Sequence, residues 1–390
     1  MHRLQFHYTL SRDSSPALVR NPLIDLLQAV SAHGSISGGA RALDLSYRHV
    51  WGELKRWENE LGNELLVWEK GQSARLTEFA SKLMWAERQA QARLAPQIEA
   101  LRSELERAFA VAFDPQAHVV TLYASHDDAL GALREHALAT DGDVKGGVTQ
   151  LHLDTRFCGS VDAIRALNEG RCVMAGFHTL QHPAPGSLAE LTYKPLLQPG
   201  LHKIIGFAQR TQGLMVAKGN PLGLQSLQDI ARTSARFINR TRGTGTRVVL
   251  DELLAQAGIA PASIQGYDTV EQSHTAAALA VSSGSADAAL GIAIAAQAQG
   301  LDFVPLVQEN YHLVCLKSAL QEPAIESLLA LLQSPAWQAK LAALPGYTPA
   351  RSGEVLSLRE VLSWWSFARP KTNKSGNANQ PGKASKAKAP

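Results

Sequence analysis

The sequence predicts an α/β protein with an all-α/winged-helix N-terminal domain, and three observations lead to this prediction. Residues 22–61 contain three short stretches with the apolar spacing of amphipathic helices. One apolar stripe then runs from Thr77 to about Phe109, as in a single long helix. From His118 onward, apolar runs of strand length alternate with helical stretches, which is typical of an α/β fold with mainly parallel sheets.

Length and composition set the first limits. With 390 residues, 45% of them hydrophobic and 19% charged, the chain has the composition of a globular protein with two or three domains. It contains no apolar window long enough for a bilayer and no signal-peptide core at its start, so we expect a cytoplasmic protein without membrane contact. Cys158, Cys172 and Cys315 form no CxxC pair, which favours buried free thiols over a metal site. The net charge of +3 is too small to indicate nucleic-acid binding by itself.

The first three helices are expected to form a helix-turn-helix. Residues 1–21 show no periodicity and are predicted to be a flexible arm. Helices are expected from Leu23 to His33, from about Ser37, and from the capping residue Ser46 to about Leu61. The last helix of such a motif enters the major groove of DNA. Because the third helix also carries three glutamates, a solvated helix in any three-helix domain is the alternative.

Outward polar residues of this domain are the candidates for DNA contact. Residues 65–68 and 74–76 flank a Lys-Gly turn and are predicted to form a hairpin wing, which completes a winged helix-turn-helix at residues 22–76. Arg48 can form a two-pronged contact with a guanine edge or a phosphate. The residues predicted to bind DNA are Ser35, Ser37, Ser46, Tyr47, Arg48, Trp51, Lys55, Arg56, Lys70 and Arg75.

The run from Gly34 to Trp51, together with Leu54 and residues 60–62, 65–67 and 74–77, resembles the winged helix of ModE-type molybdenum-responsive regulators, relatives of the LysR family. The resemblance covers about residues 22–100 and implies binding to double-stranded operator DNA. His49 departs from the family pattern, where another basic or small residue is usual, and this leaves the base preference open.

Residues 77–113 are predicted to form a linker and dimerisation helix. A stripe of this length outside a globular core needs a partner, and a second copy of the chain is the simplest one. In LysR-like regulators the equivalent helix pairs two subunits, so the resemblance implies a homodimer or a higher oligomer; packing against its own chain is the alternative. The stripe, interrupted at Pro96, consists of Phe79, Leu83, Ala86, Ala90, Leu94, Ile98, Leu101 and Leu105.

The α/β part offers polar groups where strands end and helices begin, which is where such folds bind ligands. The loop from Asn239 to Thr246 leads from a short strand into a helix and presents N–H groups and hydroxyls at the positive end of a helix dipole. It is expected to bind an anion, and an ordinary turn capped by Thr246 is the alternative. The predicted strands are residues 119–124, 150–157, 173–177, 203–207, 214–217, 237–239, 288–292, 303–306 and 311–316.

This part of the chain, between about Val119 and Tyr347, resembles the periplasmic-binding-protein-like (PBP-like) domain of predicted molybdate- or tungstate-sensing regulators. The resemblance implies two α/β lobes hinged around a cleft, in a domain at residues 118–368. Lobe I is placed at about 118–213 and 306–368, lobe II at about 214–305, and residues 369–390 are expected to be a disordered Lys-rich tail. The matching segments are 125–130, 159–160, 175–178, 212–221, 237–240, 242–247, 250–251, 266–267, 274, 286–287, 290–292 and 300–306.

A fully deprotonated tetraoxyanion such as molybdate or tungstate suits a pocket made only of hydrogen-bond donors. Arg240 resembles in position an arginine of tungstate-binding periplasmic proteins. Against this ligand, Asp127 and Asp128 lie beside the predicted site and would favour a protonated or cationic one; His274 is alternatively a capping or core residue. The predicted ligand-binding residues are Ser125, Gly159, Ser160, Arg240, Thr244, Gly245, Thr246, Arg247, Tyr267 and His274.

Together these features predict a dimeric transcription regulator whose two-lobed domain closes on molybdate or tungstate and transmits closure to operator DNA. One alternative is the same architecture with a small organic anion or pterin-like ligand, and another is a ligand-binding module without DNA activity. We expect no catalysis and no catalytic cofactor. Ser160, His178 and Asp287 are candidates for a triad by residue type only, because the sequence contains no G-x-S-x-G or H-E-x-x-H motif.

Overall fold

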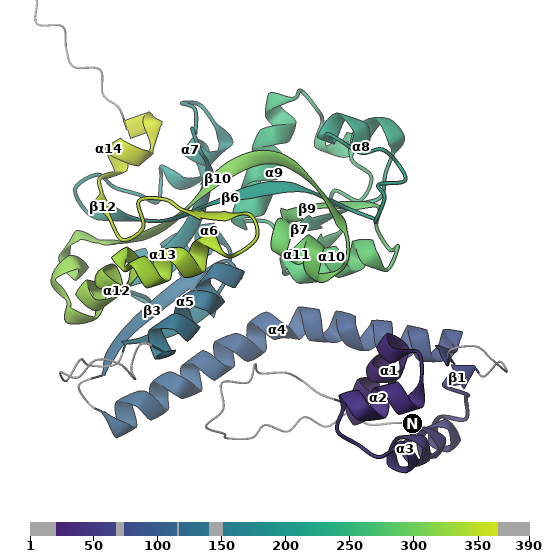
Figure 1. Cartoon of the computed structure of the whole chain (residues 1–390). Coiled ribbons are helices and arrows are strands. Elements are labelled where there is room, and N and C mark those ends of the chain that lie inside the picture. The colour runs from purple at the N-terminus through teal and green to yellow at the C-terminus, as the bar shows by residue number, and fades with distance from the viewer. Residues whose placement is uncertain (1–20, 68–73, 115–116, 140–150, 366–390) are drawn as a thin grey trace, which may run out of the picture.

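The computed structural model describes residues 21–67, 74–114, 117–139 and 151–365. A small helical N-terminal domain is joined by one long helix, α4, to a larger α/β domain (Figure 1). The predicted arm, Lys70 with the turn of the wing, and the predicted tail lie outside the described residues. In the part of the chain that the structure describes, no helix is both long and apolar enough to cross a membrane.

The N-terminal domain has the predicted winged helix-turn-helix architecture. Ser46 caps the third helix by accepting a hydrogen bond from the backbone N–H of His49. The turn before it contains Asp44 in the left-handed region (φ 55°), which aspartate tolerates better than most residues. The elements are α1 (Pro22–His33), α2 (Ile36–Ala42), α3 (Tyr47–Leu61), and the antiparallel strands β1 (Leu66–Val67) and β2 (Arg75–Leu76).

The core of this domain joins all three helices to the start of α4. Val50 and Leu54 of α3 are buried, while Trp57 and Leu61 lie half-buried at the core's edge. Ala80 and Met84 of α4 complete the core. The N-terminal domain and α4 are therefore packed as one unit, and a movement of α4 would carry the domain with it.

Helix α4 (Glu78–Phe113) is capped by Thr77 and ends at the predicted residue, four residues beyond the apolar stripe. One side, with Ala92, Pro96 and Ser103, is buried against the α/β domain, so the alternative of packing on its own chain is correct for that side. The opposite side leaves part of the apolar stripe in solvent, with Leu101 57% exposed. Further exposed apolar residues on this helix are Trp85, Leu105, Phe109, Val111 and Phe113.

The α/β domain contains one ten-stranded sheet in the order β4-β3-β5-β10-β6-β9-β7-β8, with β11 and β12 paired to β6. Its two ends form two lobes. The first lobe is built on the parallel strands β3, β4 and β5, and the second on β7, β8 and β9. The strands are β3 (His118–Ala124), β4 (Leu151–Phe157), β5 (Met174–Leu180), β6 (His202–Val216), β7 (Phe237–Arg240), β8 (Val270–Glu271), β9 (Ala288–Ile292), β10 (Asp302–Leu316), β11 (Tyr347–Pro349) and β12 (Val355–Leu356).

Two strands are longer than predicted, and they join the lobes. The predicted strands 203–207 and 214–217 are parts of the single strand β6, and 303–306 and 311–316 are parts of β10. Of the polar residues that separate them in the sequence, Arg210, Gln212 and Glu309 are buried and bind one another across the antiparallel β6–β10 pair, so the strands continue through the predicted gaps. Because β10 also runs antiparallel to β5, and β6 to β9, the sheet is mixed and not mainly parallel as predicted.

Helices cover both lobes, with α5, α6, α12 and α13 on the first and α8 to α11 on the second (Figure 1). Cys158, Cys172 and Cys315 are free thiols, as predicted, and the last two are buried. The helices are α5 (Asp128–Ala139), α6 (Ser160–Asn168), α7 (Leu188–Tyr193), α8 (Leu227–Thr233), α9 (Gly245–Gln256), α10 (His274–Ser282), α11 (Ala293–Ala298), α12 (Pro323–Gln333), α13 (Pro335–Ala342) and α14 (Leu358–Val361).

Candidate functional site

Two helix N-termini from opposite lobes meet at the junction. Helix α6 follows β4 and starts after Gly159, which makes no side-chain cap; α9 follows β7 and starts after Thr244, which caps it. The backbones touch closely, since a Cβ built on Gly159 would lie 2.7 Å from the carbonyl oxygen of Gly243. The backbone N–H of Val161 also donates to that oxygen (3.4 Å). The lobes are therefore closed on each other at this point.

A second glycine allows close approach from the other side. A Cβ on Gly245 would lie 2.5 Å from Nδ1 of His178, a fully buried residue of β5. The His178 ring stacks on Tyr311 of β10, with 4.0 Å between the ring centroids. Burial first, and then the neighbouring Arg210, lowers the pKa of His178 well below its usual value, so this imidazole is neutral.

Arg240, at the end of β7, is a buried cation that also acts on His178. It is 2% exposed, and its Nη2 donates to the backbone carbonyl of Gln272 (2.9 Å). Its Nε and Nη1 have no hydrogen-bond partner among the described residues. Burial first, and then the like charge of Arg210, lowers the pKa of Arg240 to about 9, while Asp127 and Glu309 act in the opposite direction.

Other buried polar atoms at the junction also lack a partner within the described residues. A buried polar group without a partner is costly, and such groups in native proteins bind water or a ligand. We call this set, with Arg240 and Thr246, the junction cluster. The unpartnered atoms are Oγ of Ser125, Oγ of Ser160, both ring nitrogens of His178, Oε1 of Gln212, Nδ1 of His274, Oε2 of Glu309 and the hydroxyl of Tyr311.

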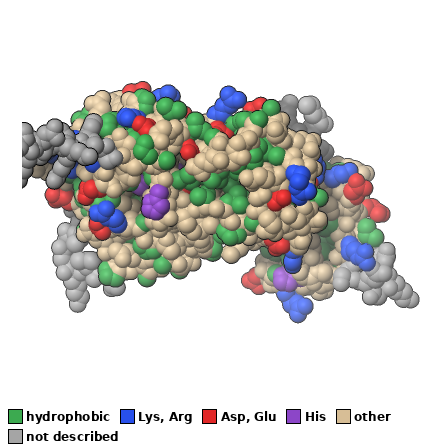
Figure 2. All heavy atoms as spheres, turned by 90° about the horizontal axis from the view of Figure 1, so that it is seen from above, with side chains coloured by type: hydrophobic (Ala, Val, Ile, Leu, Met, Phe, Trp, Pro, Cys, Tyr) green, Lys and Arg blue, Asp and Glu red, His purple; other side chains and the backbone are tan. Residues whose placement is uncertain are grey.

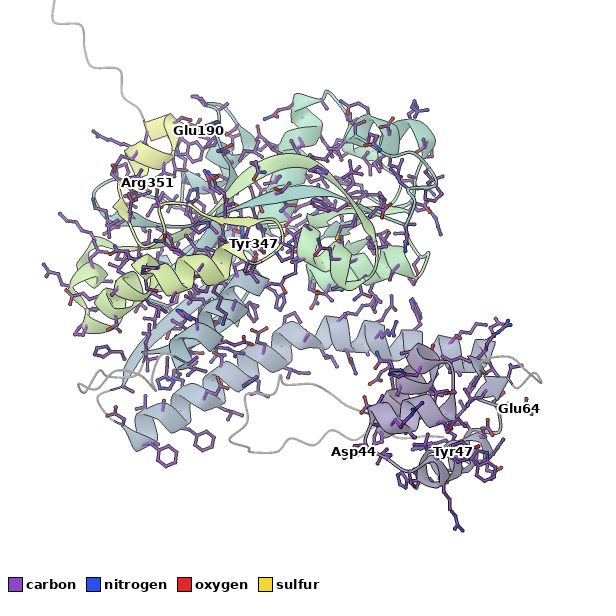
Figure 3. The ribbon with its side chains drawn as sticks, in the orientation of Figure 1. Asp44, Tyr47, Glu64, Glu190, Tyr347 and Arg351 are labelled. Atoms are coloured by element: carbon purple, nitrogen blue, oxygen red, sulfur yellow. The ribbon has the colours of Figure 1, made fainter. Side chains whose placement is uncertain are left out.

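An ion network lies beside the junction cluster. Arg210 of β6 binds Glu309 Oε1 through Nε and Asp127 Oδ2 through Nη1. Tyr347, labelled in Figure 3, donates to the same Asp127 oxygen (2.9 Å), and the other oxygen accepts the N–H of Ala129 (2.8 Å). Burial opposes the charge of Arg210, but Glu309 and Asp127 outweigh it and raise its pKa. Asp127 thus has an internal cationic partner, which it shares with Glu309, and this weakens the argument against an anionic ligand.

Gln212 connects this network to α9. Its amide nitrogen donates to Glu309 Oε1 (2.9 Å) and to Thr246 Oγ1 (3.0 Å). Thr246 in turn lies 3.3 Å from Nε2 of His274, the first residue of α10. Burial and the nearby Arg240 lower the pKa of His274 well below its usual value, so His274 is also neutral.

Most of the predicted ligand-binding residues come together here. Ser125 and Gly159 follow the neighbouring parallel strands β3 and β4, and Arg240, Gly245, Thr246 and His274 approach from the second lobe. Thr244 caps α9, and its hydroxyl donates to the Thr241 carbonyl (2.8 Å).

Arg247 and Tyr267 form a separate group. The Arg247 guanidinium lies 3.9 Å from the Tyr267 ring centroid, and both side chains bind Asp251.

The sequence did not lead us to assign Arg210, Gln212, Glu309 or Tyr347 to the site, and His178 was considered as a polar residue at a strand end and as a triad candidate. Arg210 and Gln212 alternate on one face of β6, a period-two signal that lies in the gap between the predicted strands 203–207 and 214–217. Among the described residues, no group of three or more His, Cys, Asp or Glu side chains is arranged to hold a metal ion.

A cavity of about 260 Å³ lies between α4, α5 and α11 and shares Asp127 with the ion network. Four of its nine lining residues are acidic. The lining residues are Glu99, His126, Asp127, Asp128, Gly131, Ala132, Glu135, Ile294 and Leu344.

The predicted DNA-binding surface lies on α3. Tyr47 and Trp51 are 51% and 44% exposed, and Tyr47 is on the side of the N-terminal domain that faces away from the α/β domain (Figure 3). Arg48, the residue after Tyr47, is also exposed. The hydroxyls of Ser35 and Ser46 accept cap bonds from their helices.

The other residues predicted to contact DNA either have intramolecular partners on α3 or lie on other elements. Lys55 binds Glu58 (2.6 Å), and Arg56 binds Glu53 (2.7 Å) and lies over the Trp57 ring. Ser37 is exposed and its carbonyl accepts from Arg41, while Arg75 is exposed on the wing strand β2. On the face shown in Figure 2, basic and acidic side chains are interspersed, so that face offers no surface of one sign for DNA.

Comparison with known families gives one match in the N-terminal domain and one in the α/β domain. Residues 23–81 match the family described as bacterial regulatory helix-turn-helix protein, lysR family, and residues 143–333 match the PBP superfamily domain. The chain is 33% identical over 236 residues to the uncharacterized protein YvgK of Bacillus subtilis (strain 168), which covers 57% of this chain and 74% of the relative. It is 34% identical over 111 residues, 28% of this chain and 98% of the relative, to an uncharacterized Clostridium pasteurianum protein from a ferredoxin gene 5' region.

Solved structures with similarity include a cysteine mutant of Corynebacterium glutamicum OxyR, with 16% identity, coverage of 85% of this chain and 96% of that chain, and a TM-score of 0.41. Another is LysG of the same organism with bound effector Arg, with 16% identity, coverage of 84% and 100%, and a TM-score of 0.39. The chain thus belongs to one family with YvgK, its residues 143–333 match the PBP superfamily domain, and it carries at its N-terminus a helix-turn-helix of the bacterial regulatory lysR family.

Proposed function

We propose that this chain is a transcription regulator whose α/β domain senses a small oxyanion, with molybdate or tungstate as the effector. The observation that carries the proposal is the buried guanidinium of Arg240, whose Nε and Nη1 have no partner among the described residues. The nearby carboxylates of Asp127 and Glu309 are already bound to Arg210. A buried cation in this position is best compensated by an anion that enters from outside.

The surroundings of Arg240 favour an anion over a neutral ligand. The N-termini of α6 and α9 approach from opposite lobes, and each adds N–H groups and the positive end of a helix dipole. Ser125 and Ser160 add hydroxyl donors. His178 is neutral, so one of its ring nitrogens carries a hydrogen that it can donate.

A second effector class is favoured by two acceptors in the same cluster. Oε2 of Glu309 and Oε1 of Gln212 are buried without partners among the described residues. A ligand that brings a hydrogen to these oxygens would satisfy them, as a protonated oxyanion, a small organic anion or a pterin-like molecule does. Molybdate and tungstate carry no such hydrogen at neutral pH, so this observation separates the two classes.

For DNA binding, we propose that Arg48, Tyr47 and Trp51 of α3 contact an operator, and that two copies of the chain pair through the exposed side of α4. The exposed apolar residues of α4 support the pairing, since they have no covering element among the described residues. The resemblance of residues 22–100 to ModE-type regulators supports operator DNA as the binding partner. A regulator of this kind acts in the cytoplasm and needs no catalytic cofactor.

Calorimetry with molybdate, tungstate, sulfate, phosphate and a panel of small organic anions tests the effector. We expect molybdate or tungstate to bind and Arg240→Gln to abolish binding. Arg236→Gln is the matched control, because Arg236 precedes the same strand but makes an exposed ion pair with Asp287. If no tetraoxyanion binds, or if Arg240→Gln binds as the wild type does, the oxyanion proposal is wrong; binding of organic anions alone supports the second class.

A gel-shift assay with the region upstream of the protein's own gene tests DNA binding. Arg48→Ala should lose retention, while Lys82→Ala, which removes an exposed cation of α4 paired with Glu78, should keep it. Retention by neither the wild type nor the Lys82 variant would instead support a ligand-binding module without DNA activity.

A further inference from the structure

Helix α4 is attached to both lobes of its own chain (Figure 1). Toward its C-terminal end it binds the first lobe: Ser103 donates to the Leu153 carbonyl (2.8 Å) and accepts from the Thr155 N–H (2.9 Å), and Arg107 binds Asp154 (2.9 Å). Near its middle it binds the second lobe, at residues 271–273. The helix therefore bridges the two parts whose relative position closure of the lobes would change.

The contact with Ser273 depends on Pro96. In a regular helix the N–H of residue 96 would donate to the carbonyl of residue 92, but proline has no N–H. The Ala92 carbonyl instead accepts a hydrogen bond from Oγ of Ser273 (3.2 Å). Ser273 is 1% exposed, and its hydroxyl also accepts the N–H of Ala276 and so caps α10. One hydroxyl group thus joins the start of α10 to the carbonyl of α4 that Pro96 leaves without an N–H donor.

The contact with Glu271 is a bidentate ion pair. Arg93 Nη2 lies 2.6 Å from one carboxylate oxygen of Glu271, and Nε lies 3.2 Å from the other. The Glu271 side chain is buried, so this carboxylate relies on Arg93 for its charge compensation. Gln272 lies between Glu271 and Ser273 in the chain, and its side chain accepts a hydrogen bond from Gln97 (3.3 Å).

The same short segment touches the junction cluster from its other side. Arg240 donates through Nη2 to the carbonyl of Gln272, and Arg240 is the parallel β-sheet partner of Glu271. His274, which follows Ser273 in the chain, lies beside Thr246. Residues 271–274 are therefore in direct contact with the proposed ligand-binding arginine and with α4.

We propose that residues 271–274, the relay segment, make ligand occupancy of the junction cluster and the position of α4 depend on each other. The inference rests on the proposed function for its ligand. An anion bound to Nε and Nη1 of Arg240 fixes the guanidinium, and the bond from Nη2 to Gln272 fixes the segment that holds Ala92 and Arg93. Since the N-terminal domain shares its core with α4, ligand binding then reaches the DNA-binding helices. Linkage makes the effect reciprocal, so changes in α4 alter ligand affinity.

The first test needs no ligand. Hydrogen exchange of the full chain is compared for wild type, Arg240→Gln and the control Arg236→Gln, in peptides covering residues 88–98 and 270–282. We expect Arg240→Gln to accelerate exchange in both peptides and Arg236→Gln in neither. Faster exchange at 270–282 with no change at 88–98 would overturn the relay, whatever ligand the protein binds.

The second test uses molybdate and tungstate as probes. Arg93→Gln removes the exposed partner of the Glu271 pair without touching the junction cluster, and Arg107→Gln removes a comparable pair of α4 with the first lobe. We expect Arg93→Gln to weaken binding about fivefold or more, the lower range of allosteric coupling, and Arg107→Gln to leave it unchanged. If Arg93→Gln binds as the wild type does while Arg240→Gln does not bind, the relay is wrong and the oxyanion site stands. If the wild type binds neither ion, the oxyanion proposal fails and the exchange experiment alone decides on the relay.

Discussion

Arg210 and Glu309 are directly paired residues of β6 and β10, and their side chains form a buried ion pair where both strands cross between the lobes. Asp127 of the first lobe adds a second carboxylate to the same guanidinium. The ion pair therefore joins the two strands that connect the lobes. Loss of the Arg210 charge leaves two buried carboxylates without this cation.

We expect Arg210→Met to lower the free energy of unfolding of the α/β domain by about 3–5 kcal/mol, the cost of breaking a buried ion pair from one side. Urea unfolding followed by circular dichroism measures this. The control Arg165→Met removes an exposed pair with Asp162 and should change little. An equal effect of both variants would show that the buried network does not stabilise the lobe junction.

Gly159→Ala should weaken anion binding by holding the lobes apart. Its new Cβ would lie 2.7 Å from the Gly243 carbonyl oxygen, and overpacking of this kind costs about 1–3 kcal/mol. Calorimetry with molybdate measures the loss. Gly131→Ala in α5 is the control, because its Cβ would meet only Glu99 Oε1 at 3.5 Å. Unchanged affinity in Gly159→Ala would mean that closure at this contact is not needed for binding.

Stability should fall as the pH is lowered from 7 to 5, in part through His312. Burial lowers the pKa of His312 to about 3 from the ordinary 6.5, so the unfolded chain binds its proton first. Stability from this residue is therefore complete above about pH 6.5 and is lost as the pH falls toward 3, by roughly 2 kcal/mol at pH 5.

Urea unfolding at both pH values checks the effect of His312. In His312→Gln, which can keep the bond to Thr179 without titrating, the decrease should be smaller by that amount. An identical decrease in both proteins would contradict the assignment.

Phe109→Glu and Leu105→Glu should convert a dimer into a monomer if the exposed side of α4 pairs two subunits. A charge in an apolar helix pair costs more than the contact contributes. Sedimentation velocity measures the change in mass. Leu191→Glu is the control, because Leu191 is 67% exposed on α7 in the α/β domain, away from α4. A wild-type monomer, or a dimer in all variants, would contradict pairing through this side.

The sequence predicted the helices of the N-terminal domain closely because their end signals are local. Ser46 caps α3, and Gly34 follows α1 in the left-handed conformation, so each boundary is encoded within a few residues. The strand ends that carry Ser125 and Gly159 were predicted for the same reason: short polar residues follow apolar runs.

The parts that were missed depend on contacts between distant segments. Arg210 and Glu309 are 99 positions apart, and each is acceptable inside a strand only because the other neutralises it. Arg247 adjoins the predicted anion loop in sequence, but its position in the first turn of α9 directs it toward Tyr267 and Asp251. Neither relationship has a local signal that periodicity could detect.

Pro96 determines where a movement of the second lobe acts on α4. If Ser103 acts as a fulcrum on the first lobe, the relay contact at Arg93 lies ten residues away and Ala80, in the N-terminal core, lies twenty-three residues away. At about 1.5 Å per residue these lever arms are roughly 15 and 35 Å. A small shift of the second lobe would therefore be amplified about twofold at the DNA-binding domain, and the proline that opens Ala92 to Ser273 sets the point at which the lever is pushed.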